Sequence, residues 1–139
     1  MTIFDAESVK MTQVTGPFAV KMTPQADEGS PLGRMLLDKK YDGPLEATSV
    51  GQMLAGMTAV SGSAGYVAME QVTGALDGRP GTFILMHMGV MDRSAQSLTI
   101  TVIPDSGTGE LEGLSGKMKI VMVDGKHTYE FDYDLPATA

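Results

Sequence analysis

Glu70 and His87 form the carboxylate–imidazole pair that strand spacing brings side by side in this sequence. The segment Gly74–Gly81 predicts a turn around Asp77–Pro80, and symmetric pairing of the two flanking strands places Glu70 opposite His87. A carboxylate beside an imidazole fixes the tautomer of the ring and raises its pKa, which is how a general base is built. The pair is therefore a candidate catalytic site. The alternative, which is the commoner case in proteins, is a buried ion pair or hydrogen-bonded network that only fills the barrel interior.

A second hairpin supplies further polar groups for the same interior. Asp124-Gly125 is the strongest short hairpin signal in the chain, and it pairs Met122 with His127 and Ile120 with Tyr129. One face of this hairpin then combines apolar side chains with one imidazole and two phenols. Imidazole and phenol groups in an apolar wall are typical of small-molecule pockets. The predicted ligand-binding residues are Tyr66, His127, Tyr129 and Tyr133.

No cofactor or metal is expected. Glu70, His87 and His127 could form a facial triad for a metal ion, but they lack the local spacing that marks such sites. The sequence contains no cysteine, which excludes disulfides, thiolate zinc sites, iron–sulfur clusters and thiol nucleophiles.

The elements that must position these residues are β-strands. Short β-branched or Met-rich runs alternate with turn signals, and helical periodicity is nearly absent. Such a chain must close its edges or stack two sheets, so we expect a single closed antiparallel β-barrel of about eight strands, with a β-sandwich as the alternative. The predicted strands are 13–23, 35–45, 47–54, 65–74, 82–90, 97–103, 110–123 and 127–135.

Length and charge narrow the class of protein. The chain has 139 residues, 42% of them hydrophobic, which predicts one domain over 1–139 with a core at about 13–135. A net charge of −7 argues against nucleic acid or an anionic membrane surface as partner. The start, Met1–Glu7, has no basic or apolar region of a signal peptide, and no run of residues is apolar enough to span a membrane, so we expect a cytoplasmic protein.

Several motifs together resemble a bacterial domain-of-unknown-function family, over about residues 13–135. The family's fold resembles the allene oxide cyclase-like barrels, which implies a small eight-stranded antiparallel barrel. The resemblance places Glu70, His87, His127 and Tyr129 on family motif positions and favours an inward polar face in the central hairpin. It carries over no catalytic residue of the plant cyclase. The motifs lie within Gly65–Glu70, Gly74–Phe83, His87–Gly89, Pro104–Gly116 and His127–Leu135.

Three functions remain open at this point. The leading interpretation is a barrel that binds a small, partly apolar molecule. The first alternative is an isomerase or cyclase that uses Glu70 and His87 as an acid–base pair, and the second is a structural or interaction barrel filled by its own side chains.

Strand alternation has a consequence for the outer wall. If Glu70 and His87 face inward, an apolar patch must face outward, and a symmetry mate is the usual cover for such a patch. We therefore expect a homo-oligomer, a dimer rather than a trimer. The patch residues are Val67, Met69, Ile84, Met86, Met88 and Val90.

Overall fold

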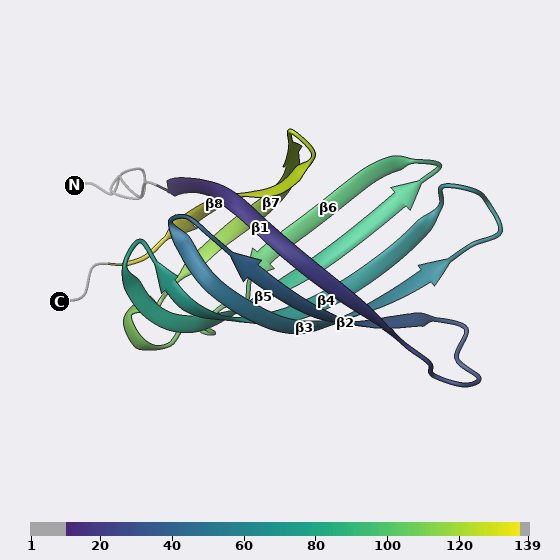
Figure 1. Ribbon diagram of the computed structural model, residues 1–139, viewed down its shortest axis with the longest axis horizontal. Coiled ribbons are helices and arrows are strands. Elements are labelled where there is room, and N and C mark those ends of the chain that lie inside the picture. Colours follow the sequence, from purple (N-terminus) through teal and green to yellow (C-terminus); the bar gives the residue numbers. More distant parts are fainter. Residues whose placement is uncertain (1–10, 137–139) are drawn as a thin grey trace, which may run out of the picture.

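The computed structural model describes residues 11–136, which form one closed barrel of eight antiparallel strands (Figure 1). Each strand pairs with the next along the chain, and β1 pairs with β8 to close the sheet. The predicted barrel is confirmed, and the sandwich alternative is wrong. The strands are β1 (Thr12–Gln25), β2 (Gly33–Tyr41), β3 (Leu45–Met57), β4 (Ala64–Leu76), β5 (Arg79–Asp92), β6 (Ala95–Val102), β7 (Ser115–Val123) and β8 (Lys126–Asp134).

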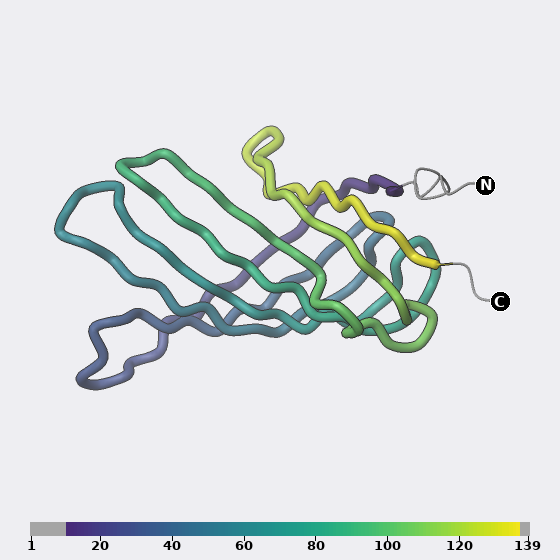
Figure 2. Tube along the Cα trace, turned by 180° about the vertical axis from the view of Figure 1, so that it is seen from behind, coloured from purple at the N-terminus to yellow at the C-terminus, as the bar shows by residue number. Residues whose placement is uncertain are grey.

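The two ends of the barrel differ. At one end, which we call the open end, the β1–β2, β3–β4 and β5–β6 hairpins extend as separate loops, whereas the start of β1 and the end of β8 lie toward the other end (Figure 2). We call that other end the closed end. The pairing of β6 with β7 is short, with two residue pairs between the strands, so the wall is least continuous there.

Apolar side chains fill the half of the barrel next to the closed end. The connection from β6 to β7 contains the short 3-10 helix η2 (Gly109–Leu111) and carries Leu111 and Leu114, which are both almost fully buried. The Tyr129 hydroxyl donates to the Asp42 carbonyl and accepts from the Leu45 amide, tying β8 to the β2–β3 turn. The packed side chains include Leu45, Val72, Leu76, Phe83, Leu85, Ile100, Phe131 and Tyr133.

The two hairpins predicted from the sequence have different outcomes. The register of β7 and β8 is the predicted one, with Met122 paired to His127 and Ile120 to Tyr129. The predicted register of the central hairpin is wrong by two residues, because its turn consists of Asp77 and Gly78 alone. Both residues have positive φ, 49° and 81°, as a two-residue hairpin turn requires. A shift of two residues keeps every side chain on its predicted face, but it pairs Ala68 with His87 and Glu70 with Leu85.

Two predicted strand limits are wrong by four and five residues, and the other limits differ from the structure by at most three. The second strand ends at Tyr41 instead of Leu45, because Gly43 adopts a φ of 96° in the turn that follows. The seventh strand begins at Ser115 instead of Glu110, because the residues before it form η2 and a turn at Gly113. The glycine-rich segment that the sequence predicted as the start of a strand therefore packs its buried leucines, Leu111 and Leu114, against the core at the closed end.

Candidate functional site

A layer of polar side chains crosses the middle of the barrel, above the apolar half. Glu70 on β4 lies at its centre and is fully enclosed, with 1% of its surface exposed. Its Oε2 accepts hydrogen bonds from Lys39 Nζ at 2.8 Å and His87 Nε2 at 2.6 Å. Its Oε1 accepts from the Tyr41 hydroxyl at 2.5 Å and the Ser49 hydroxyl at 2.7 Å. Four strands, β2 to β5, therefore converge on one carboxylate.

The electrostatics of this layer keep Glu70 ionised. Burial alone raises the pKa of its carboxyl, but hydrogen bonds from His87, Lys39 and Tyr41 and the positive charge of Lys39 outweigh burial and lower the pKa to about 2. Burial and the neighbouring Glu70 charge raise the pKa of the Tyr41 phenol, which stays a hydrogen-bond donor. The layer is thus a buried Lys39–Glu70 ion pair with an imidazole attached to the same carboxylate oxygen.

Lys39 also lies against aromatic rings. Its Nζ is 5.3 Å from the ring centre of Phe18 and 5.8 Å from that of Tyr41, within the range of cation–π attraction. The Lys39–Glu70 ion pair and the two rings compensate the cost of placing an ammonium group, 6% exposed, inside the barrel.

A cavity of about 240 Å³ lies between the polar layer and the open end. Side chains from all eight strands line it. Lys39 and His87 are its polar floor, and His127 and Tyr66 lie nearer the rim. The remaining lining is apolar: Phe18, Val20, Met22, Leu37, Met53, Ala68, Leu98 and Ile120.

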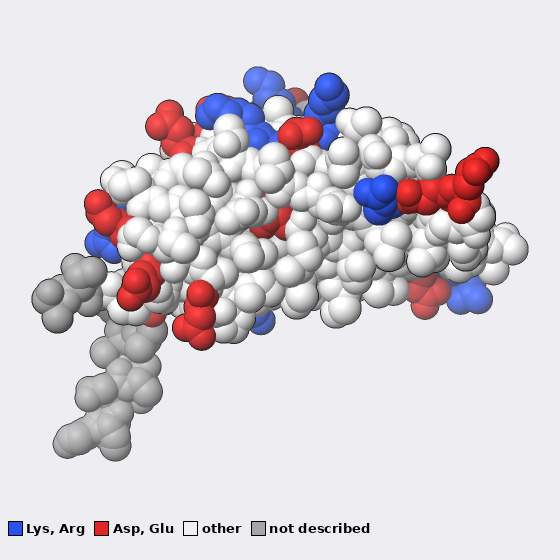
Figure 3. Space-filling model, turned by 90° about the horizontal axis from the view of Figure 1, so that it is seen from below, with Lys and Arg blue, Asp and Glu red and all other residues white. Residues whose placement is uncertain are grey.

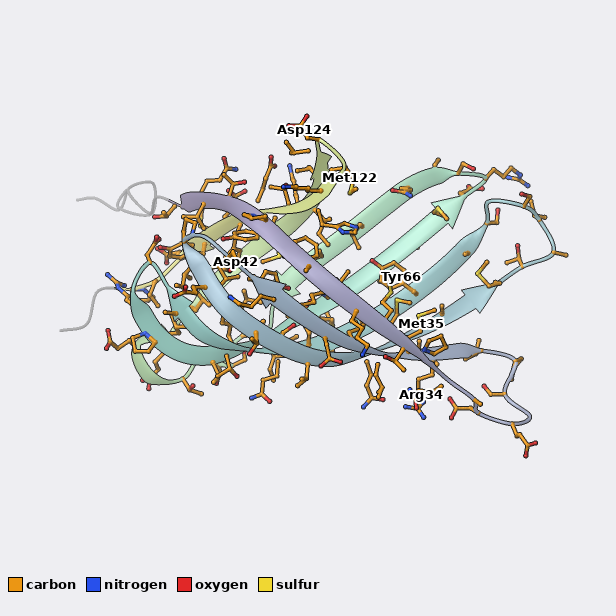
Figure 4. The ribbon with its side chains drawn as sticks, viewed as in Figure 1. Arg34, Met35, Asp42, Tyr66, Met122 and Asp124 are labelled. Carbon is orange, nitrogen blue, oxygen red and sulfur yellow. The ribbon has the colours of Figure 1, made fainter. Side chains whose placement is uncertain are left out.

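Tyr66 and His127 are held at the rim by neighbours on adjoining strands. The Tyr66 ring lies across Gly89 of β5, where any Cβ would overlap ring carbons. Figure 4 shows Tyr66 in the open half, while Arg34 points away from the barrel. The His127 ring stacks on Phe18 with 5.2 Å between ring centres, and the side chain remains exposed.

Comparison with known proteins places this chain in a family. The family model described as "Protein of unknown function (DUF3224)" matches residues 14–133. The chain belongs to the DUF3224 family. Among solved structures, a protein with unknown function from the DUF3224 family of Shewanella oneidensis MR-1 is 50% identical. It superposes with a TM-score of 0.88, with 93% of this chain and all of that chain covered. No curated protein matches. The predicted resemblance is confirmed.

The DUF3224 chain brings together some of the predicted site residues and separates others. Glu70 and His87 are hydrogen-bonded as diagonal neighbours instead of lying directly opposite each other, and Tyr66 and His127 share their cavity. Tyr129 and Tyr133 lie in the closed half and do not line the cavity, since Tyr129 bonds to the β2–β3 turn and Tyr133 donates to the Asp77 carboxylate. Within residues 11–136, no group of three His, Asp or Glu is arranged to hold a metal ion.

Sequence reasoning missed three members of the polar layer, namely Lys39, Tyr41 and Ser49. A signal for Lys39 was available, because Leu37 and Tyr41 flank it at intervals of two and both belong on an inward face. Since Lys39 and Lys40 are adjacent in a strand, one of the two had to point inward.

Proposed function

We propose that this DUF3224 protein binds a small, partly apolar molecule in the open half of its barrel. The observation that supports the proposal is the 240 Å³ cavity with an apolar wall and a polar floor. Ligand sites in proteins commonly have this combination, in which apolar surface gives affinity and a few polar groups give orientation.

The size of the cavity limits the ligand. An apolar cavity of about 150 Å³ in another protein holds benzene, so 240 Å³ accommodates roughly ten non-hydrogen atoms. A second hollow of about 270 Å³ at the mouth shares Met53, Tyr66 and Leu98 with the cavity. A longer molecule would therefore extend past Tyr66 toward the β3–β4 and β5–β6 hairpins.

The filled-barrel alternative applies to only half of the molecule. Phe83, Phe131 and the leucines around them pack together in the closed half. Above the polar layer the inward positions of β4 carry Ala64 and Ala68, whose small side chains leave room, whereas the Tyr66 ring occupies the space over Gly89 of β5. A barrel selected only for stability would fill this volume, because each void lowers the free energy of unfolding.

Equilibrium dialysis with naphthalene, an apolar probe of suitable size, tests the proposal. Leu98 lines the cavity and Leu54 lies on the outer wall, and the two are equally exposed, at 41% and 40%. We expect the wild type and Leu54→Trp to bind naphthalene and Leu98→Trp to bind at least tenfold more weakly. Equal binding by both variants, or no binding by the wild type up to the solubility of naphthalene, would refute the proposal.

Acid–base catalysis by Glu70 and His87 is the second candidate function. Its support is that Glu70 fixes His87 Nε2, while Nδ1 has no hydrogen-bond partner within residues 11–136 and the ring lines the cavity. An oriented imidazole with one free nitrogen is the arrangement of a general base. The test is incubation in D₂O with small apolar metabolites extracted from the protein's own cells. A molecule that gains deuterium with the wild type but not with His87→Gln would support an isomerase or cyclase.

We also propose that the protein is a homodimer. Apolar side chains on the outer wall of β2 to β5 are 37–62% exposed, and two shallow grooves run between them. Figure 3 shows charged side chains mainly around the margin of the molecule and few in its middle. A stable interface buries about 800 Å² per partner around an apolar centre, and a two-fold axis lets one patch cover itself. We call these residues the outer patch: Leu36, Val50, Leu54, Val67, Met69, Met86, Met88 and Val90.

The cellular location stays a prediction from the sequence. Within residues 11–136 no helix has the length and apolar character that crossing a membrane requires.

A further inference from the structure

We infer that the ligand carries a neutral carbonyl oxygen, which Lys39 binds at the floor of the cavity. This inference rests on the proposed ligand-binding function and names the chemical class of the ligand. Its basis is that the polar layer has N–H donors facing the cavity that make no hydrogen bond within residues 11–136.

Lys39 is the group with donors to spare. An ammonium has three N–H donors and no acceptor, and within residues 11–136 the hydrogen bond to Glu70 Oε2 is the one that Lys39 Nζ makes. The Lys39 side chain is 6% exposed and lines the cavity. Buried donors are normally satisfied, so the cavity side of Nζ requires an acceptor atom from outside the chain.

The charge balance of the layer favours a neutral acceptor over an anion. Glu70 is ionised and already offsets the charge of Lys39 at 2.8 Å. A ligand carboxylate at the same floor would leave two carboxylates facing one ammonium in an interior of low dielectric constant. A ketone or aldehyde oxygen accepts the same N–H without adding charge.

The surroundings of Lys39 Nζ fit a carbonyl group with an apolar remainder. Phe18 and Leu37 lie beside Lys39 in the cavity wall, and Ala68 of β4 and His87 of β5 line the same cavity. Among the floor groups, His87 is the neighbour of Lys39, because both bond to Glu70 Oε2. A carbonyl bound by Lys39 would therefore place its adjacent carbon atoms next to the imidazole, with the rest of the ligand directed toward Met53 and Leu98.

A matched series of probes tests this inference at pH 7.5: 2-nonanone, nonane and nonanoate, each measured by competition with naphthalene. We expect 2-nonanone to bind about tenfold more tightly than nonane, since a hydrogen bond to a charged donor provides roughly this factor. It should also bind more tightly than nonanoate, whose charge would lie in the barrel interior beside ionised Glu70. The Lys39→Met variant should lose this preference and bind nonane more tightly than 2-nonanone, because the buried carbonyl oxygen would then lack its donor.

A second variant guards against misfolding. Lys39→Met leaves Glu70 without its counter-charge, so Lys39→Met/Glu70→Gln, which removes both charges, is measured beside it. Equal affinities of the wild type for 2-nonanone and nonane would overturn the inference, and so would tighter binding of nonanoate or an unchanged preference in the double variant. Failure of naphthalene itself to bind the wild type would instead refute the proposed function.

Discussion

The Glu70 carboxylate accepts four side-chain hydrogen bonds, so a substitution there should lower the stability of the fold more than one at any single partner. Glu70→Gln leaves the buried Lys39 ammonium without a counter-charge, so we expect the free energy of unfolding to fall by about 3–5 kcal/mol. Chemical denaturation monitored by circular dichroism measures this change.

Two further variants separate the effect of an unpaired buried charge on stability from the effect of lost packing. The double variant Lys39→Met/Glu70→Gln should recover part of the loss, because neither charge remains. His87→Gln should cost less than Glu70→Gln, because Glu70 keeps its bonds to Lys39, Tyr41 and Ser49. A stability of Glu70→Gln within about 1 kcal/mol of the wild type would show that the carboxylate is not part of a buried ion pair.

The low pKa of Glu70 also predicts how stability depends on acidity. The folded-state pKa is about 2 and the ordinary value is 4.5, so ionised Glu70 stabilises the fold above about pH 5, and this contribution disappears as the pH falls toward 2. The contribution is about 3 kcal/mol. The difference in unfolding free energy between wild type and Glu70→Gln should therefore narrow between pH 5 and pH 2. A difference that stays constant over this range would contradict the low pKa.

At the scale of elements, the β4–β5 hairpin determines where Tyr66 lies. A Cβ at Gly89 would overlap the Tyr66 ring, whereas a Cβ at Gly65, on the neighbouring strand, has its nearest neighbour at 3.7 Å. We expect Gly89→Ala to lower the free energy of unfolding by about 1–3 kcal/mol and Gly65→Ala to have little effect. Thermal denaturation of both variants checks this, and Gly89→Ala/Tyr66→Ala should regain part of the loss. Equal effects of Gly89→Ala and Gly65→Ala would mean that the Tyr66 ring does not lie over Gly89.

The strands and their pairing registers could be predicted from the sequence only in part. The eight strands and the inward face of the β7–β8 hairpin follow from period-two alternation, and the register of β7 and β8 follows from Asp124-Gly125. In the central hairpin both faces carry apolar side chains, so alternation did not decide between them, and the inward polar face was predicted from the family resemblance. The central register was wrong because Asp77-Gly78-Arg79-Pro80 fits a four-residue turn as well as a two-residue turn. The side chains remained on their predicted faces because the error was two residues.

The candidate site could be predicted only in part, because it depends on pairing between distant strands. Glu70 and His87 are joined by one hairpin, so local spacing identifies them. Lys39 and Tyr41 lie on β2, which is separated from β4 and Glu70 by β3, and their side chains meet Glu70 inside the barrel. No local pattern states which inward residues of β2 lie at the level of Glu70, because that level depends on two successive registers.

At the scale of the whole molecule, the outer patch predicts self-association. Met86 and Met88 lie within it, whereas Met122, at 59% exposure, lies at the tip of the β7–β8 hairpin outside it (Figure 4). Light scattering over a dilution series should give a dimer mass for wild type and Met122→Lys and a monomer mass for Met86→Lys and Met88→Glu. A monomer mass for the wild type at every concentration would exclude the proposed dimer.

The central claim is that the open half of the barrel, and not its outer wall, receives the ligand. Methionine methyl groups mark both surfaces: Met22 and Met53 line the cavity, and Met69, Met86 and Met88 lie on the outer patch. The most direct measurement is therefore an NMR titration of ¹³C-methyl-methionine protein with naphthalene. We predict that the Met22 and Met53 methyl resonances shift with saturation, while those of Met69, Met86 and Met88 stay in place. Shifts confined to the outer methionines, or no shift up to the solubility of naphthalene, would contradict the account.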